Sequence, residues 1–192
     1  MTVLLLGLLV FLGTHSVRIF ADDWRTRQIA RRGEGAWKGI FSAASTIGLV
    51  LIVWGYGIAR AQPAVLWTPP VWGRHLAGLL NLVAFVLVAA AYVRGNAIKA
   101  KLGHPMVLGV KVWAFAHLLA NGTLHAVALF GAFLAWAVAD FASARRRDRK
   151  AGTTYPAGSL ARDAMTVAGG VVAWAAFALL LHGWLIGVRP FG

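Results

Sequence analysis

The chain has 192 residues, of which 59% are hydrophobic and 13% charged, and its formal net charge is +13. A soluble globular domain carries about 25% charged and about 45–50% apolar residues, so this composition excludes a water-soluble globule, a disordered chain and a collagen-like chain. The absence of cysteine from the sequence also excludes disulfides, thiolate metal ligands and thiol nucleophiles.

Six stretches of the chain are apolar enough to predict transmembrane helices, since a helix needs about 20 mostly apolar residues to cross about 30 Å of hydrocarbon. The first lacks the basic residues that precede the apolar core of a signal peptide, so we expect an uncleaved span. In chain order the predicted spans are Thr2–Phe20, Gly39–Ala59, Arg74–Val93, Pro105–Ala120, Thr123–Phe141 and Thr166–Val188.

The stretch from Pro105 to Phe141 is long enough to form a single helix, but the turn-forming pair Asn121–Gly122 interrupts it and predicts a hairpin of two short helices. The basic residues support the hairpin, because with six spans sixteen of the 19 basic residues fall in alternate connections. They are Arg18, Arg25, Arg27, Arg31, Arg32 and Lys38 after the first span, Arg94, Lys99, Lys101 and Lys111 after the third, and Arg145, Arg146, Arg147, Arg149, Lys150 and Arg162 after the fifth.

Basic connections stay in the cytoplasm, which places both termini on the periplasmic side. We therefore predict an all-α, polytopic integral membrane helical bundle with six transmembrane helices, forming one domain over residues 1–192 of a bacterial cytoplasmic (inner) membrane protein. The partner that the basic clusters fit is the lipid bilayer with its anionic headgroups, and not nucleic acid.

Ionisable residues inside a bilayer are costly, so each one is a candidate functional residue. Acidic residues lie at the predicted cytoplasmic margins, which argues against acid–base chemistry by paired carboxylates. The remaining candidates are the six histidines, His15, His75, His104, His117, His125 and His182.

His15 and Arg18 share one face at the cytoplasmic end of the first span. This arrangement suits a haem, with the imidazole bound to iron and the guanidinium paired with a propionate. The alternative is a histidine that hydrogen-bonds between helices, followed by an arginine that reaches the membrane surface.

His117 shares a helix face with Trp113 and Asn121, and the three side chains would form the wall of a polar pocket or, alternatively, His117 would only hydrogen-bond between helices. His104 precedes Pro105, which predicts a place at the start of a helix. His75, His125 and His182 lie near the outer ends of their spans, where an outward-facing metal site is one hypothesis and ordinary interfacial polarity the other.

Two stretches, Thr14–Arg18 and Gly103–Gly122, resemble the NnrU family of small bacterial membrane proteins. The second contains the pattern H-P-x-x-x-G-x(3)-W-x(3)-H-x-x-x-N-G, and the similarity extends from the first span to the last. The family shares its domain with 15-cis-zeta-carotene isomerase.

The resemblance implies a b-type haem held between two histidines, at positions that His15 and His117 match. If a haem binds there, the helix spacing predicts that Arg18 pairs a propionate and that Trp113 and Asn121 shape the pocket, with Arg18, Trp113 and Asn121 as further cofactor-binding residues. It links the protein to nitrite and nitric oxide reduction, or to a haem-dependent cis–trans isomerisation, with nitric oxide or an apolar polyene as the ligand. The isomerase has a cysteine where this chain has Ala114, so ligand exchange by a thiolate is closed here. The alternative function is a non-catalytic accessory or assembly protein of a respiratory or denitrification oxidoreductase complex.

Overall fold

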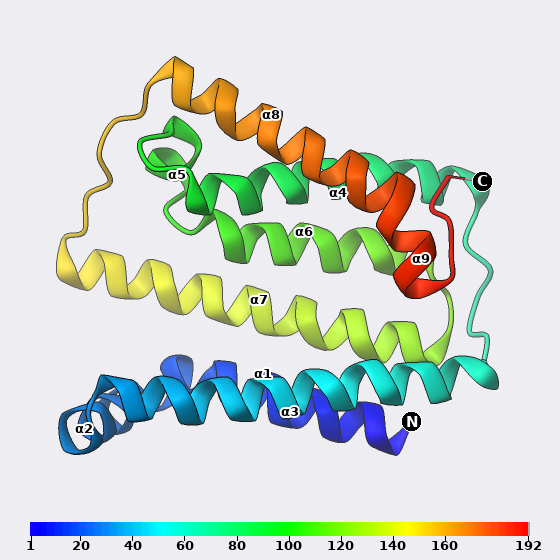
Figure 1. Cartoon of the computed structure of the whole chain (residues 1–192), viewed down its shortest axis with the longest axis horizontal. Helices are drawn as coiled ribbons and strands as arrows, with labels where there is room; N and C mark the ends of the chain where they lie inside the picture. The colour runs from blue at the N-terminus through cyan, green and yellow to red at the C-terminus, as the bar shows by residue number, and fades with distance from the viewer. Residues whose placement is uncertain (192) are drawn as a thin grey trace.

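The computed structural model describes residues 1–191, and over these residues the chain is almost entirely helical, with an isolated bridge between Val65 and Thr123 in place of any strand. Gly192, the last residue of the predicted domain, lies outside the described residues. The helices are α1 (Thr2–Phe20), α2 (Asp22–Arg32), α3 (Glu34–Ala61), α4 (Val71–Tyr92), α5 (Ala97–Leu102), α6 (Pro105–Ala120), α7 (Leu124–Ala151), α8 (Leu160–Ala176) and α9 (His182–Ile186), with a π-helical turn at Phe177–Leu181 (Figure 1).

Five helical segments are long and apolar enough to cross a membrane: α1, α3, α4, α7 and the continuous stretch Leu160–Ile186. The multi-pass helical architecture predicted from the sequence is therefore confirmed. The helix α6 has only 16 residues, which span about 24 Å, so the sixth crossing stays a prediction. The predicted break at Asn121–Gly122 is confirmed, because α6 ends at Ala120 and α7 begins at Leu124.

The structure differs from the sequence prediction in two details. Lys111 was counted in a basic connection, but it lies inside α6, because Pro105 starts this helix six residues before Lys111. The prediction also did not include the short helices α2 and α5, which lie in the connections after the first and third spans.

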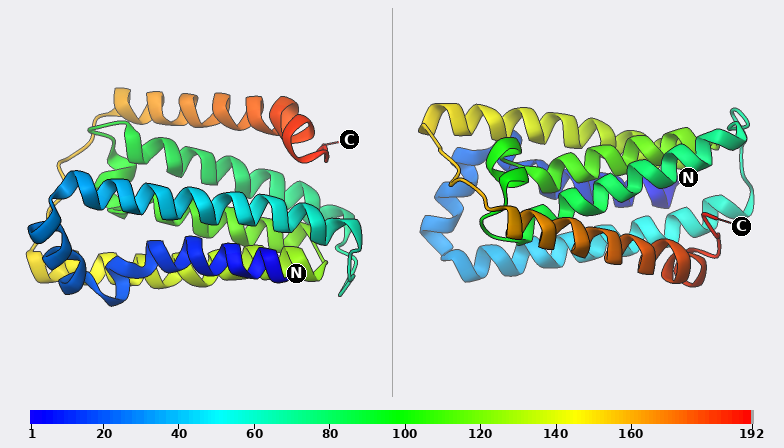
Figure 2. Two further views of the ribbon diagram at one scale, coloured as in Figure 1. Left: turned by 60° about the horizontal axis from the view of Figure 1, so that its bottom comes forward. Right: turned by 90° about the horizontal axis from the view of Figure 1, so that it is seen from above.

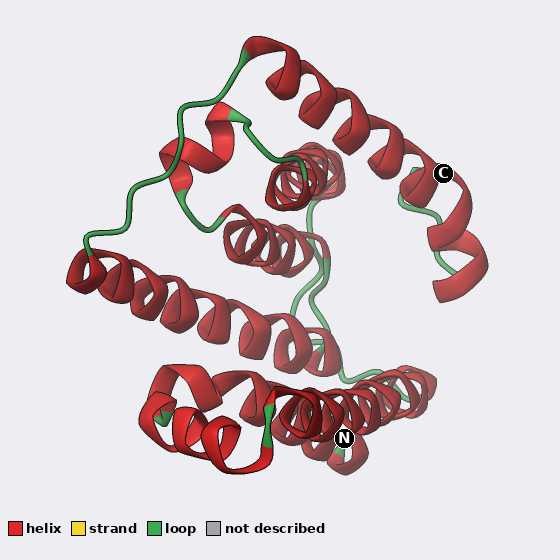
Figure 3. Cartoon of the chain, turned by 60° about the vertical axis from the view of Figure 1, so that its left-hand side comes forward, coloured by secondary structure: helices red, strands yellow, loops and turns green. Residues whose placement is uncertain are grey.

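The long helices pack in the order α3, α1, α7, α6, α4 and α8, so that each of the four inner ones contacts two neighbours (Figures 1 and 2). One end of the bundle carries α2, α5 and the connection from α7 to α8, and most of the basic residues lie in α2 and α5 and in the adjoining ends of α1, α3, α7 and α8. The other end carries both chain ends, together with the α3–α4 and α6–α7 connections (Figure 3).

Glycines bring α1 and α3 into backbone contact. A Cβ on Gly48 would lie 2.7 Å from the Phe11 nitrogen, and one on Gly7 would lie 2.6 Å from the Ile52 nitrogen. Small residues permit such close packing in a bilayer, where association rests on van der Waals contact because lipid is as apolar as the side chains. The helix α1 also packs on α7, and the three helices share the main apolar core, which contains Leu4, Leu8, Ile52, Ala126, Leu129 and Phe130.

The connection from α3 to α4 is fastened to the α6–α7 turn by backbone hydrogen bonds. The amides of Leu66 and Trp67 both donate to the Gly122 carbonyl, at 2.8 and 3.1 Å. The Leu124 amide donates to the Ala64 carbonyl at 2.9 Å. These bonds fix the C-terminal end of α6 at Ala120, three residues beyond His117.

Candidate functional site

The imidazole of His15 is oriented by its own helix. Its Nδ1 lies 2.7 Å from the carbonyl oxygen of Phe11, one turn earlier in α1. Because a carbonyl oxygen can only accept, Nδ1 carries the proton and Nε2 presents a lone pair. Within the described residues no hydrogen bond is made by Nε2, so this nitrogen is free to bind a metal.

Aromatic rings from three helices surround His15. Its ring stacks on Phe11 at a centroid distance of 4.2 Å, and the rings of Phe41 on α3 and Trp136 on α7 lie at 5.0 and 6.0 Å. Two polar atoms here, Trp136 Nε1 and Ser45 Oγ, are buried without a hydrogen-bond partner in the described part of the chain. Ser45 lies one turn along α3 from Phe41. Buried polar atoms are almost always paired, so each of these two is available to a ligand.

His117 on α6 has the same arrangement. Its Nδ1 lies 2.9 Å from the Trp113 carbonyl oxygen, which again leaves the Nε2 lone pair free. The ring stacks on Phe130 of α7 at 4.5 Å and lies 5.2 Å from the Trp113 ring. The side-chain amide of Asn121 donates to the His117 carbonyl at 2.8 Å, so this residue closes the end of α6.

The two histidines lie at opposite sides of one aromatic cluster, formed by Phe11, Trp113, Phe130 and Phe133. Phe133 of α7 lies 5.7 Å from Phe11 and 5.5 Å from Trp113, which connects the surroundings of the two imidazoles. The structure therefore places His15 and His117 around the same helix, α7, but does not bring their rings into contact. Chemically, the site offers two imidazoles whose Nε2 atoms make no hydrogen bond within the described residues, in an apolar aromatic layer.

Arg18 lies one turn beyond His15 toward the basic end of the bundle, and its side chain is exposed. Its backbone carbonyl accepts a hydrogen bond from Arg147 at 3.4 Å. The guanidinium makes no ion pair within the described residues, so it is available to an anionic group near the membrane surface.

The outer histidines do not assemble. His75 is exposed, His182 Nδ1 lies 2.6 Å from the Val188 carbonyl, and His125 is buried with Nε2 3.2 Å from Thr123 Oγ1. Across residues 1–191 no three His, Asp or Glu side chains gather in a group that could hold a metal ion. The hypothesis of an outward-facing three-histidine metal site was therefore wrong.

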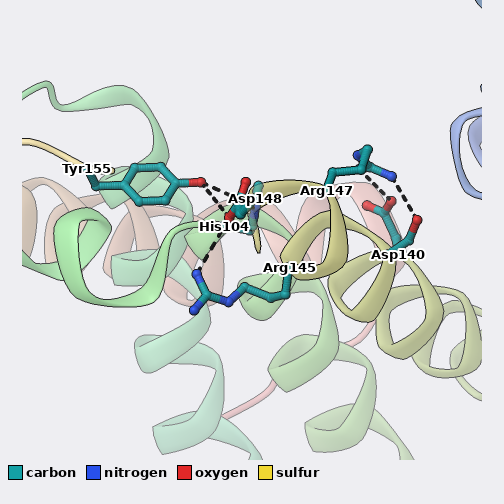
Figure 4. A network of polar contacts seen from close by, with 7 residues as sticks. His104, Asp140, Arg145, Arg147, Asp148 and Tyr155 are labelled. Atoms are coloured by element: carbon teal, nitrogen blue, oxygen red, sulfur yellow. Dashed lines mark hydrogen bonds and ion pairs between the residues drawn. The ribbon is translucent and has the colours of Figure 1, made fainter. Parts of the chain in front are cut away.

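A polar network that the sequence analysis missed lies at the basic end of the bundle (Figure 4). One oxygen of Asp148, Oδ2, lies 2.9 Å from His104 Nε2, 3.0 Å from the Tyr155 hydroxyl and 3.5 Å from a guanidinium nitrogen of Arg145. His104 also stands directly before Pro105 at the start of α6, as predicted. The available signal was Asp148 itself, a single carboxylate inside a run of arginines.

These features define an all-helical, multi-pass membrane protein with two metal-competent histidines against a shared aromatic cluster. The chain belongs to the NnrU family: the family's sequence profile, described as NnrU protein, matches residues 3–190. Comparison with curated proteins and with solved structures finds no match.

Proposed function

We propose that this protein binds a b-type haem in the bacterial cytoplasmic membrane, with His15 and His117 as its iron ligands. The observation that carries the proposal is common to both imidazoles. In each, Nδ1 is hydrogen-bonded to the carbonyl oxygen four residues earlier, and Nε2 makes no hydrogen bond within the described residues. A metal-bound histidine usually donates its second ring N–H in this way, because the hydrogen bond fixes the tautomer and the ring orientation.

The residues around the histidines fit a haem. The aromatic cluster offers flat apolar surfaces, and Trp136 Nε1 and Ser45 Oγ offer buried donors without partners. Arg18 would pair a propionate at the membrane surface, and Trp113 and Asn121 would orient His117. Because Phe133 lies between the two imidazole environments, a haem held by both histidines requires this ring to move aside.

A haem at this site supplies an iron that binds nitric oxide directly or changes its redox state beside an apolar polyene. We therefore place the protein in nitrite and nitric oxide reduction or in a cis–trans isomerisation. In either role the chain's own residues hold the iron, exclude water through the aromatic cluster and fix the imidazole protons on Nδ1.

The test is an optical spectrum of detergent-purified protein expressed with ample haem. We expect a Soret band that His15→Ala and His117→Ala each weaken or shift to a high-spin spectrum. His125→Ala and His182→Ala are the matched controls and should keep the wild-type spectrum. A wild type without a Soret band would refute the proposal, and co-purification of that protein with a respiratory oxidoreductase would then favour the accessory function.

We also propose six membrane crossings with both chain ends in the periplasm. The support is the collection of basic connections at one end of the bundle, because basic loops are retained in the cytoplasm. The chain has no cysteine, so single exposed cysteines report topology directly. An impermeant maleimide applied to spheroplasts should label Thr68→Cys but not Gly35→Cys or Ala157→Cys, and the reverse pattern would overturn the orientation.

A further inference from the structure

The helix α2 forms a cleft with the start of α3 at the basic end of the bundle. The rings of Trp24 and Trp37 form one side, with their centroids 5.9 Å apart and nearly perpendicular planes. The cavity has a volume of about 110 Å³ and is lined by Trp24, Gln28, Arg32, Trp37 and Ile40. Trp24, Gln28 and Arg32 follow each other at intervals of four residues, so they form one stripe along α2.

The helix α2 carries an excess of unpaired positive charge, of which Arg32 lines the cleft. Arg25 is paired with Asp22 at 3.6 Å, and Lys38 with Glu34 at 2.9 Å. By contrast, no carboxylate within residues 1–191 lies within 4.0 Å of the guanidinium of Arg27, Arg31 or Arg32. An apolar cleft beside unpaired arginines is complementary to a molecule that is apolar at one end and anionic at the other.

The position of α2 indicates which molecule this is. The helix begins two residues after α1 ends at Phe20, whose side chain is 80% exposed, so α2 starts where the hydrocarbon core ends. Trp24 is about half exposed, at 46%. Tryptophan rings favour headgroup depth, and basic amphipathic helices at this depth bind anionic lipid.

We propose that the cleft between α2 and α3 is a binding site for an anionic phospholipid. The Arg32 guanidinium and the Gln28 amide bind the phosphate, and Trp24, Trp37 and Ile40 contact the glycerol and the upper part of the acyl chains. The site does not depend on haem, since it is separate from His15 and His117 and involves none of the aromatic cluster.

The experiment is native mass spectrometry of the full chain in detergent, with phosphatidylglycerol titrated against phosphatidylcholine of the same acyl chains. We expect tighter binding of phosphatidylglycerol, and Arg32→Gln should weaken it about fivefold, the factor for one arginine at an anionic surface. Binding of phosphatidylcholine should not change in this variant. The matched control is Arg146→Gln, which removes an equal charge from an exposed, unpaired position on α7.

A second measurement locates the acyl chains and does not depend on charge. Phosphatidylglycerol brominated in its upper acyl chain should quench tryptophan fluorescence less in Trp24→Phe/Trp37→Phe than in wild type. Equal affinity of wild type for both lipids, or equal losses in Arg32→Gln and Arg146→Gln, would overturn the proposal. Quenching that is unchanged by the double substitution would overturn it too.

Discussion

The Nε2 atom of His104 lies 2.9 Å from Oδ2 of Asp148, and this contact joins the start of α6 to the end of α7. The hydroxyl of Tyr155 donates a hydrogen bond to the same oxygen, which attaches the α7–α8 connection to the network. Gly103, with a φ of +74°, leaves space for the network, because a Cβ there would lie 3.0 Å from Arg145 and 3.1 Å from the Tyr155 ring. The network therefore fixes α6, and with it His117, relative to α7.

Removing the shared carboxylate should loosen this end of the bundle. Asp148→Ala removes the shared acceptor of His104 and Tyr155, both partly buried, and leaves them only their mutual contact at 3.3 Å. Because the lost acceptor carries a charge and is shared by several donors, we expect the free energy of unfolding to fall. Denaturant unfolding in micelles measures it, with exposed Asp23→Ala as the control. Equal stability of the two variants would contradict the prediction.

The same network predicts a dependence on alkaline pH. Burial raises the pKa of Tyr155, and its hydrogen bond to Asp148 raises the pKa further, so the fold favours the neutral phenol. This contribution to stability is complete below the ordinary tyrosine pKa of about 10 and is lost as the pH rises through the higher pKa of the folded state. Unfolding measured between about pH 9 and pH 12 should show this loss in wild type. Tyr155→Phe should remove it, and an unchanged pH profile in this variant would refute the assignment.

The glycines between α1 and α3 predict substitutions of opposite sign. A Cβ on Gly55 would overlap the backbone of Leu4, whereas one on Gly57 would have no neighbour within 4 Å. Gly55→Ala should therefore lower the free energy of unfolding by about 1–3 kcal/mol through overpacking. Gly57→Ala should leave it unchanged or raise it by up to about 1 kcal/mol, because alanine favours the helix. Thermal unfolding of the pair tests this, and a Gly55→Ala protein as stable as Gly57→Ala would show that α1 and α3 are not in backbone contact.

The hydrogen bonds between the α3–α4 connection and the α6–α7 turn give a similar prediction at one glycine. A Cβ on Gly122 would overlap the Trp67 carbonyl oxygen, which lies in the connection that donates two hydrogen bonds to Gly122. Gly122→Ala should displace this connection and cost about 1–3 kcal/mol. Gly131→Ala, with no neighbour within 4 Å of its Cβ, is the control. Limited proteolysis between α3 and α4 should be faster in Gly122→Ala, and equal rates would contradict the role assigned to the turn.

The hydroxyl of Ser45, which has no hydrogen-bond partner within the described residues, predicts that Ser45→Ala changes the stability of the haem-free protein but not that of the haem-bound protein. A buried donor without a partner costs about 1–3 kcal/mol, so Ser45→Ala should stabilise the ligand-free protein by about 1 kcal/mol. Ser42→Ala, on the exposed side of the same helix, controls for helix propensity. With haem bound, we expect the gain to disappear because the hydroxyl then has an acceptor. A gain that persists with haem would show that Ser45 does not contact the bound group.

The sequence predicted the long helices well and their contacts poorly. The bounds of α1 and α6 were predicted to the residue, because an apolar run and Pro105 define them. The polar helix α2 was missed, since only three apolar or aromatic residues mark its amphipathic pattern. The helix α7 continues ten residues beyond the predicted end at Phe141, because arginines favour a helix even after it leaves the membrane.

For the site, residues that share a helix could be predicted together, as Trp113 and His117 were. The arrangement around His15 could not be predicted, because Phe41 and Trp136 come from other helices and only the packing order brings them there. The pairing of His104 with Asp148 was missed for the same reason, since 44 residues separate them. Single-sequence patterns carry periodicity along a helix but little information on which helices become neighbours.

The packing of α1 between α3 and α7 has a consequence for synthesis of the chain. The helix α3 follows α1 almost directly, but α7 begins only at Leu124, about 100 residues after α1 ends, which takes roughly 5–20 s to translate. During this interval the side of α1 that carries His15 faces lipid, without Trp136 and Phe133 over it. An apolar cofactor diffusing in the bilayer can therefore reach His15 from the side, before the later helices enclose it.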